Sequence, residues 1–149
     1  MCLIIDASVA PRVFSSNEDA DFQPVRDSLF QTHGLKAKLV YGGKLLVECQ
    51  KIGDAVRLLA VLDRAGRAEF IDNERVNDEE EQIKSLGICK SNDPHVLALA
   101  RVSHVRLLCT YDKDLIVDFT NKDLVDEPRG KVYQKASHRH LIAEFCHSW

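Results

Sequence analysis

Short apolar runs alternate with amphipathic stretches along the chain. The runs at 1–5, 35–41, 68–71 and 105–109 have the length and composition of buried strands. Between them apolar positions recur at three- and four-residue intervals, which predicts helices over 7–14, 22–33, 44–51, 54–65, 73–86 and 137–147. Another helix is predicted to begin at Asp93 and Pro94. Strands that alternate with helices indicate an α/β fold on a parallel sheet, with helices covering both faces.

The length and charge of the chain narrow the range of functions. Its 149 residues can form one domain with a sizeable core, and we expect a single domain over 1–149. The formal net charge of −3 provides no overall attraction to nucleic acid, so binding a polyanion would need a local basic patch or metal ions. The start, MCLIIDAS, lacks signal-peptide features, and no apolar run has membrane-spanning length. We therefore expect a cytoplasmic protein without a membrane segment.

The five cysteines are widely spaced along the sequence. They form no C-x-x-C pair, and their number is odd. Cys2 and Cys109 fall within apolar runs, where a thiol behaves as a small apolar side chain. This pattern predicts free thiols in a reducing cytoplasm rather than disulfides.

The stretch 91–118 contains two acids, Asp93 and Asp112, that we expect at the same edge of the sheet. A helix between two parallel strands runs antiparallel to them, so its N-terminus lies at the edge where the strands end. Asp93 stands at a predicted helix start, and Asp112 follows the predicted strand 105–109. Asp6, at the tip of the first strand, would reach the same edge. Ligands bind at this edge in open α/β sheets.

Each of these acids also has a purely structural explanation. Asp6 could cap the next helix, and Asp93 before Pro94 has the pattern of a simple N-cap. Asp112 or Asp114 could cap the helix that follows them. Taken one at a time, these acids do not define a functional site.

Glu48 lies in a basic and apolar part of the sequence. An ion pair with Lys44 or Lys51 at helical spacing is the structural explanation, and such pairs contribute little on a surface. Apolar residues on the same predicted helix face, Leu45 and Ile52, favour a partly buried acid with a functional role.

The combination of acids is more specific than its members. Acids at a strand tip, on an early helix, at a helix start and in a post-strand turn supply the oxygen ligands that Mg²⁺ or Mn²⁺ prefers. Such a centre suits hydrolysis of phosphate esters, because the metal activates water and neutralises the scissile phosphate. Four carboxylates this close repel one another, so at least one should have a raised pKa in the metal-free protein.

Four segments, in this order, resemble motifs of the PIN-domain family of metal-dependent nucleases, which includes VapC-like toxins of toxin–antitoxin pairs. They are IIDAS ending at Ser8, KLLVE ending at Glu48, NDPHVLALA over 92–100 and LLCTYDKDL over 107–115. The resemblance covers most of the chain. It implies a three-layer α/β/α sandwich around a central parallel sheet, and cleavage of single-stranded RNA with Mg²⁺ or Mn²⁺.

The resemblance also implies roles for individual residues. The catalytic acids would be Asp6, Glu48, Asp93 and Asp112. The metal ligands would be Asp6, Asp93, Asp112 and the auxiliary acid Asp114. Two small polar positions of the family correspond to Ser8 and Thr110.

The expected partners follow from the same resemblance. RNA is the substrate it implies, together with a homodimer and, for a toxin, an antitoxin protein. The most basic stretch of the chain contains Arg129, Lys131, Lys135 and Arg139. These side chains could follow an RNA backbone, and an ordinary solvated face is the alternative explanation.

A different class of function is a catalytically silent PIN-like module that acts through protein or RNA binding. The intact set of acids argues against it, since a binding module has no need to assemble mutually repelling carboxylates. Among other α/β enzymes, a haloacid-dehalogenase-type phosphatase would need D-x-D where this chain has Asp6, Ala7 and Ser8. Metal-dependent RNA cleavage that single acid substitutions abolish would separate the nuclease from the silent module.

Overall fold

The computed structural model describes residues 2–14, 19–31, 34 and 36–146. Within these residues the strands are β1 (Ile4–Ile5), β2 (Leu39–Tyr41), β3 (Ala68–Phe70), β4 (Leu107–Cys109) and β5 (Lys131–Tyr133). The helices are α1 (Ala10–Phe14), α2 (Gln23–Phe30), α3 (Gly43–Cys49), α4 (Gly53–Arg64), α5 (Asn73–Leu86), α6 (Pro94–Ser103), α7 (Lys113–Phe119), the 3₁₀ turn η1 (Ala136–His138) and α8 (His140–Phe145). Ends of predicted elements at 1, 32–33, 35 and 147 lie outside the described residues. None of the helices in the described part is long and apolar enough to cross a membrane.

The strands are parallel and form two hydrogen-bonded groups, which confirms the predicted α/β class. β1, β4 and β5 pair in that order, and β2 pairs with β3. A parallel bridge between Leu3 and Leu39 joins the groups, and the Val40 N–H donates to the Leu3 carbonyl at 3.0 Å. The spatial order is therefore β3-β2-β1-β4-β5. The chain reverses its direction of travel across the sheet between β1 and β4, and ligands bind at such switch points.

The core is centred on β1, β4 and α6. Ile4, Leu108 and Cys109 are fully buried, as expected of strands that are covered on both faces. Along α6, residues 96–100 are also fully buried. Side chains in the first turn of α6 are therefore fixed by a helix that cannot shift without opening the core.

The ends of α5 follow the capping residues that the sequence shows. Asp72 accepts a hydrogen bond from the Glu74 N–H at 3.2 Å, and Gly87 ends the helix with φ of 66°. β5 goes beyond the sequence-based prediction, because its three residues are too few to show a period.

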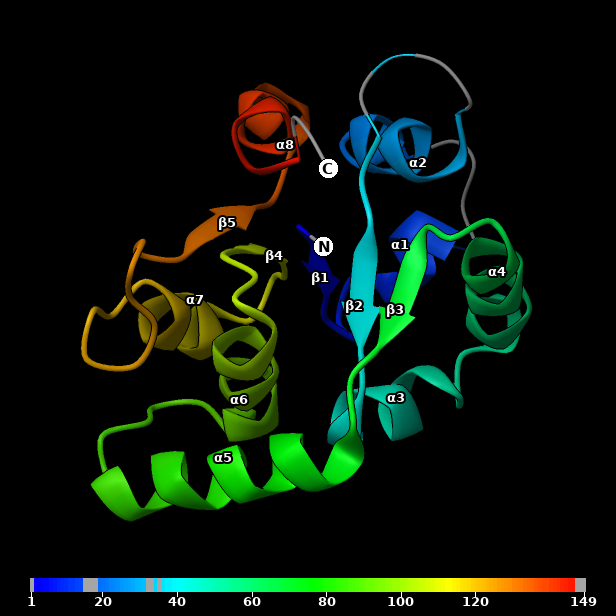
Figure 1. Ribbon diagram of the computed structural model, residues 1–149. Helices are drawn as coiled ribbons and strands as arrows, with labels where there is room; N and C mark the ends of the chain where they lie inside the picture. Colours follow the sequence, from blue (N-terminus) through cyan, green and yellow to red (C-terminus); the bar gives the residue numbers. More distant parts are fainter. Residues whose placement is uncertain (1, 15–18, 32–33, 35, 147–149) are drawn as a thin grey trace.

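Figure 1 shows which elements lie at each end of the sheet. β2 and β3 run side by side and point toward α3 and the start of α5. α5 continues across this end and packs against α6. α2 and α8 lie at the opposite end. The helices that carry Glu48 and the residues after Asp93 are thus grouped near the carboxyl ends of the strands.

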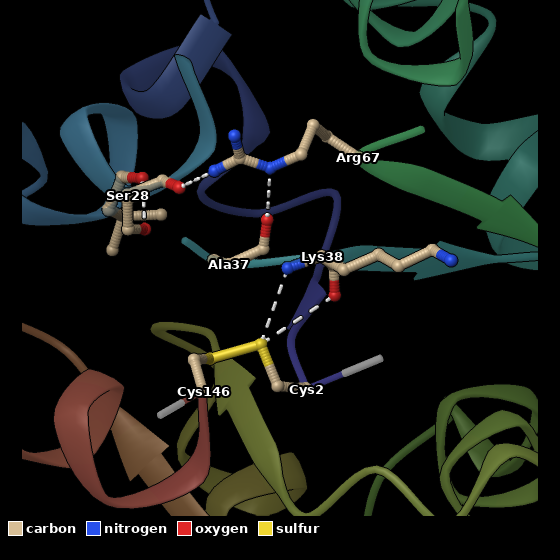
Figure 2. The surroundings of a disulfide bond; sticks show 7 residues. Cys2, Ser28, Ala37, Lys38, Arg67 and Cys146 are labelled. Atoms are coloured by element: carbon tan, nitrogen blue, oxygen red, sulfur yellow. Dashed lines mark hydrogen bonds between the residues drawn. A yellow bond between two sulfur atoms is a disulfide. The ribbon is translucent and has the colours of Figure 1, made fainter. Parts of the chain in front are cut away.

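The prediction that all cysteines are free is wrong for two of them. Cys2 and Cys146 form a disulfide, with their Cα atoms 5.3 Å apart. Figure 2 shows this bond beside Lys38, whose backbone N–H lies 3.4 Å from Cys2 Sγ. The partners are 144 positions apart, so no local pattern could indicate the pairing. The other three cysteines are free, as predicted, and the cytoplasmic location, which rested partly on free thiols, stays a prediction.

Arg67 secures the same end of the molecule through backbone carbonyls. Its guanidinium donates to the Ala37 carbonyl at 2.9 Å and to the Gln31 carbonyl at 3.2 Å, and it also donates to the Ser28 carbonyl. Figure 2 shows the contacts with Ala37 and Ser28. These bonds tie the entry to β3 to the end of α2 and to the segment that leads into β2.

Candidate metal centre

Asp6 lies at the carboxyl end of β1, at the switch point of the sheet. Its side chain is buried, and Oδ2 accepts hydrogen bonds from Ser8 Oγ at 2.7 Å and from Thr110 Oγ1 at 2.8 Å. The two hydroxyl oxygens lie 3.3 Å apart, and Ser8 Oγ also accepts from the Tyr111 N–H at 3.3 Å. The two hydroxyl residues singled out in the sequence therefore orient one carboxylate oxygen of Asp6.

Asp93 and Asp112 stand at the two helix starts, as the sequence predicts. Asp112 caps α7, because its Oδ1 accepts from the backbone N–H groups of Asp114 at 3.0 Å and Leu115 at 3.1 Å. Asp93 precedes α6, yet its side chain makes no capping hydrogen bond there. The capping explanation therefore holds for Asp112 and fails for Asp93.

Glu48 and His95 meet beside Asp93. Glu48 Oε1 directly contacts His95 Nε2, and Asp93 Oδ1 lies 4.0 Å from the same nitrogen. The side chain of His95 is only 6% exposed. Neither Glu48 Oε1 nor His95 Nε2 makes a correctly oriented hydrogen bond within the described residues. The ligand atoms of the three residues lie within 4.8 Å of one another, which is a spacing that one metal ion can bridge.

Burial and the surrounding charges shift the pKa of Asp93. Burial is the main cause that raises this pKa, to about 6. Asp6 makes the next contribution and raises it, followed by His95, which lowers it. Glu48 and Asp112 add further upward contributions. The other three predicted catalytic acids therefore lie within electrostatic range of Asp93, and they add to the effect of burial in raising its pKa.

A double glycine lets α3 approach α5 and so helps to position Glu48. The N–H of Gly43 donates to Asn73 Oδ1 at 2.6 Å, and a Cβ on Gly43 would lie 2.9 Å from a valine methyl group of α5. A Cβ on Gly42 would lie 2.6 Å from the Ile71 carbonyl oxygen. Glycine is required at both positions because any side chain would push α3 away from the β3–α5 connection.

A cavity of about 630 Å³ adjoins this cluster. Its walls include Glu48, Asp93 and His95, together with the cationic side chains of Lys44 and Lys84. Pockets of this size hold small organic ligands. Lys44 pairs with Glu80 at 2.6 Å, so the ion pair with Glu48 that the sequence allows is not the one that Lys44 forms.

The remaining candidates from the sequence lie outside this cluster. Of the four predicted metal ligands, only Asp93 belongs to the group of described residues whose ligand atoms converge. Asp6 and Asp112 lie outside this group, and so does Asp114, which is exposed in the first turn of α7. Lys131 pairs with Leu107 at the start of β4, away from the acids, whereas Lys135 follows the carboxyl end of β5. None of the basic residues proposed for RNA contact lines the cavity, and all of them are exposed: Arg129, Lys131, Lys135 and Arg139.

His95 is the site residue that the sequence pattern did not reveal. The available signal was an imidazole two positions after an acid at a helix start. Histidine nitrogen is a common metal ligand. One acid and one imidazole do not define a site, however, until the fold brings Glu48 from α3 against them.

Comparison with known proteins adds no family to this geometry. No protein-family model, no curated protein and no solved structure matches the chain. The inference of function therefore rests on the residues themselves and on the resemblance of the four sequence motifs.

Proposed function

We propose that this protein is a metal-dependent endoribonuclease of the PIN type that cleaves single-stranded RNA. The proposal includes the three-layer α/β/α arrangement of that family, of which the parallel sheet is the established part. Its support is a set of acids that come from separate elements and gather at the switch point of the sheet.

The crowding of Asp93 is the observation that carries the proposal. An acid at a helix start is normally held by the first N–H groups of the helix, but Asp93 makes no such bond. Its neighbours include three other carboxylates, each of which raises its pKa. Such repulsion destabilises the metal-free fold, and a bound cation would relieve it. This arrangement of acids supports metal-assisted hydrolysis of a phosphodiester.

The residues present fit a divalent cation. Glu48 Oε1 and His95 Nε2 are buried polar atoms without hydrogen bonds in the described residues, and Asp93 completes a group within 4.8 Å. Both Mg²⁺ and Mn²⁺ accept carboxylate oxygen, but an imidazole ligand favours Mn²⁺, because Mg²⁺ prefers oxygen ligands. When bound, the ion would supply an activated water and neutralise charge on the scissile phosphate.

Residues around the cluster orient the acids by hydrogen bonds, and one acid can accept a proton from the attacking water. Ser8 and Thr110 donate hydrogen bonds that fix the Asp6 carboxylate. The backbone at the start of α7 holds Asp112. Glu48 is partly exposed and lines the cavity, so it can orient an attacking water and accept its proton.

Cleavage of a fluorescent single-stranded RNA in the presence of Mn²⁺ tests the proposal. Wild type should cleave the RNA, and EDTA should stop the reaction. Asp6→Asn and Asp93→Asn should each lower the rate by about 100-fold or more, because each removes a charge needed in the transition state. Asp114→Asn is the matched control and should have a much smaller effect, since Asp114 is exposed.

Near-wild-type cleavage by Asp93→Asn would contradict the assignment. Absence of cleavage by a wild-type protein that binds metal and RNA would support the silent binding module instead. The toxin identity and its antitoxin partner belong to the same proposal. Growth arrest on expression of wild type, but not of Asp93→Asn, would support them.

A further inference from the structure

A buried glutamate gathers two lysines at the cavity beside the metal centre. The side chain of Glu80, on α5, is 2% exposed. Lys44 Nζ, from α3, lies 2.6 Å from Glu80 Oε2, and Lys84 Nζ, one turn along α5, lies 3.0 Å from the same oxygen. The lysine side chains themselves remain 56% and 43% exposed. A fixed carboxylate thus holds two accessible ammonium groups close together.

The two ammonium groups share one buried carboxylate oxygen, and they repel each other across it. Lys84 also pairs with Glu81 at 3.3 Å, but the Glu81 side chain is 74% exposed, so solvent screens this second pair. An ion pair that only joined α3 to α5 would need a single lysine. Each ammonium has three N–H donors, so both retain donors after Lys44 bonds to Glu80 and Lys84 bonds to Glu80 and Glu81. A bound anion would use these donors and relieve the repulsion.

The lysine pair and the metal centre open into the same space. The walls of the cavity of about 630 Å³ contain Lys44, Glu80 and Lys84 as well as Glu48 and Asp93. The chain as a whole has a net charge of −3, so its attraction to a polyanion has to come from local cations. A strand that reaches the acids through this cavity would pass the two ammonium groups.

We propose that Lys44 and Lys84, held together by Glu80, form a phosphate-binding subsite for single-stranded RNA. This subsite holds a backbone phosphate that neighbours the one positioned at the metal centre. The identity of the polymer rests on the proposed function, whereas the binding of phosphate does not depend on catalysis. The subsite is distinct from the basic stretch near β5, whose residues do not line this cavity.

Binding of a short fluorescent single-stranded RNA to the full chain in EDTA tests the subsite without cleavage. Anisotropy titrations over a range of KCl concentrations give the slope of log Kd against log salt, which counts phosphate contacts. Lys44→Gln and Lys84→Gln should each weaken binding and reduce this slope by about 0.7. Lys122→Gln removes the same charge from an exposed position outside the cavity and should leave the slope unchanged.

Two further variants separate loss of charge from loss of fold. Lys84→Arg keeps the charge and should retain the wild-type slope. If Lys44→Gln proves too unstable to measure, Lys44→Gln combined with Glu80→Gln removes both charges of the buried contact and should still lose about 0.7 of slope. The proposal would be overturned if Lys44→Gln and Lys84→Gln had the same salt slope as the control Lys122→Gln.

Cleavage assays with Mn²⁺ distinguish this proposal from the proposed function. Lys44→Gln and Lys84→Gln should raise KM with little change in kcat, whereas Asp93→Asn should lower kcat. Lysine-dependent salt slopes in a protein that does not cleave RNA would uphold the subsite and overturn the nuclease. If the protein cleaves RNA but neither Lys44→Gln nor Lys84→Gln changes the salt slope of binding, the nuclease proposal stands and the subsite proposal is overturned.

Discussion

Asp118 and Asp93 lie near the same loop, and the fold surrounds them in opposite ways. Asp118, on α7, is 1% exposed and fully supplied with hydrogen-bond donors. Its Oδ2 accepts from the Ser91 N–H at 2.9 Å and from Ser91 Oγ at 2.8 Å, and its Oδ1 accepts from the Lys90 N–H at 2.9 Å. Asp93, two residues after Ser91, makes no capping bond and faces other carboxylates.

The difference separates a structural acid from the acid that we propose to be functional. Asp118 anchors the backbone of Lys90 and Ser91, and this anchor fixes the segment that leads into Asp93. Asp118, which has its hydrogen-bond donors, thereby helps to hold Asp93, which makes no capping bond, at the switch point of the sheet. Asp118 is the more deeply buried of the two acids, so burial alone would have pointed to Asp118 as the candidate site residue. The neighbours separate the two acids, because hydrogen-bond donors surround Asp118 and carboxylates surround Asp93.

Removal of the anchor should give the largest effect on stability. Asp118→Ala leaves the N–H groups of Lys90 and Ser91 without their acceptor and should lower the free energy of unfolding by about 2–4 kcal/mol. Urea denaturation measures this loss. Asp123→Ala, at an exposed position, should change stability by no more than about 0.5 kcal/mol. Equal losses for the two variants would remove the distinction drawn for Asp118.

Addition of metal should stabilise the protein through Asp93. Mn²⁺ at a hundredfold excess over its Kd should raise the free energy of unfolding by about 2.7 kcal/mol, since it binds only the folded arrangement. Asp93→Asn should gain less from Mn²⁺, and without metal it should melt at a higher temperature than wild type because it relieves repulsion. A metal-free Asp93→Asn that melts lower than wild type would show Asp93 to be a structural cap.

The imidazole should set the preference for the ion. His95→Gln should weaken Mn²⁺ binding about tenfold and change Mg²⁺ binding less, because nitrogen ligands favour the transition metal. Calorimetric titration of the metal-free protein measures both affinities. His140→Gln replaces an exposed histidine and is the control. Equal weakening of Mn²⁺ and Mg²⁺ would indicate that His95 supports the fold of the site without serving as a ligand.

The smallest expected effect is a difference in the pH dependence of stability between wild type and Asp93→Asn. The pKa of Asp93 is raised from 3.8 to about 6, so between these values the folded metal-free protein binds more protons than the unfolded chain. Stability should therefore fall as pH rises from about 4 to 6 and then level off. Chemical denaturation of wild type and Asp93→Asn isolates this contribution as their difference. A difference that does not vary with pH would mean that Asp93 titrates normally.

Local sequence patterns identified the residues whose partners are near in the chain. Asp72 and Gly87 end α5 where the pattern predicts, and Asp112 caps α7. Asp6 and Asp93 also occupy the strand tip and the helix start that the sequence indicates. These features depend on hydrogen bonds and backbone angles within a few residues, so a single sequence contains them.

Features that depend on distant partners could not be obtained in this way. The strand order requires the contact of Leu3 with Leu39, and neither residue indicates the other. His95 becomes a candidate ligand only when α3 brings Glu48 against it. The basic residues near β5 form a pattern in the sequence, but the cations at the cavity are Lys44 and Lys84, which come from separate helices.

The disulfide between Cys2 and Cys146 makes a closed ring of the polypeptide between these residues. A protease that cuts the exposed segment after Gly87 would leave an oxidised molecule in one covalent piece, with α5 and α6 still joined through the rest of the ring. The same cut in a reduced molecule would yield two polypeptides that only their packing holds together. The covalent outcome of a cut after α5 therefore depends on a disulfide beside the amino end of β2, where Cys2 Sγ lies 3.4 Å from the Lys38 backbone nitrogen.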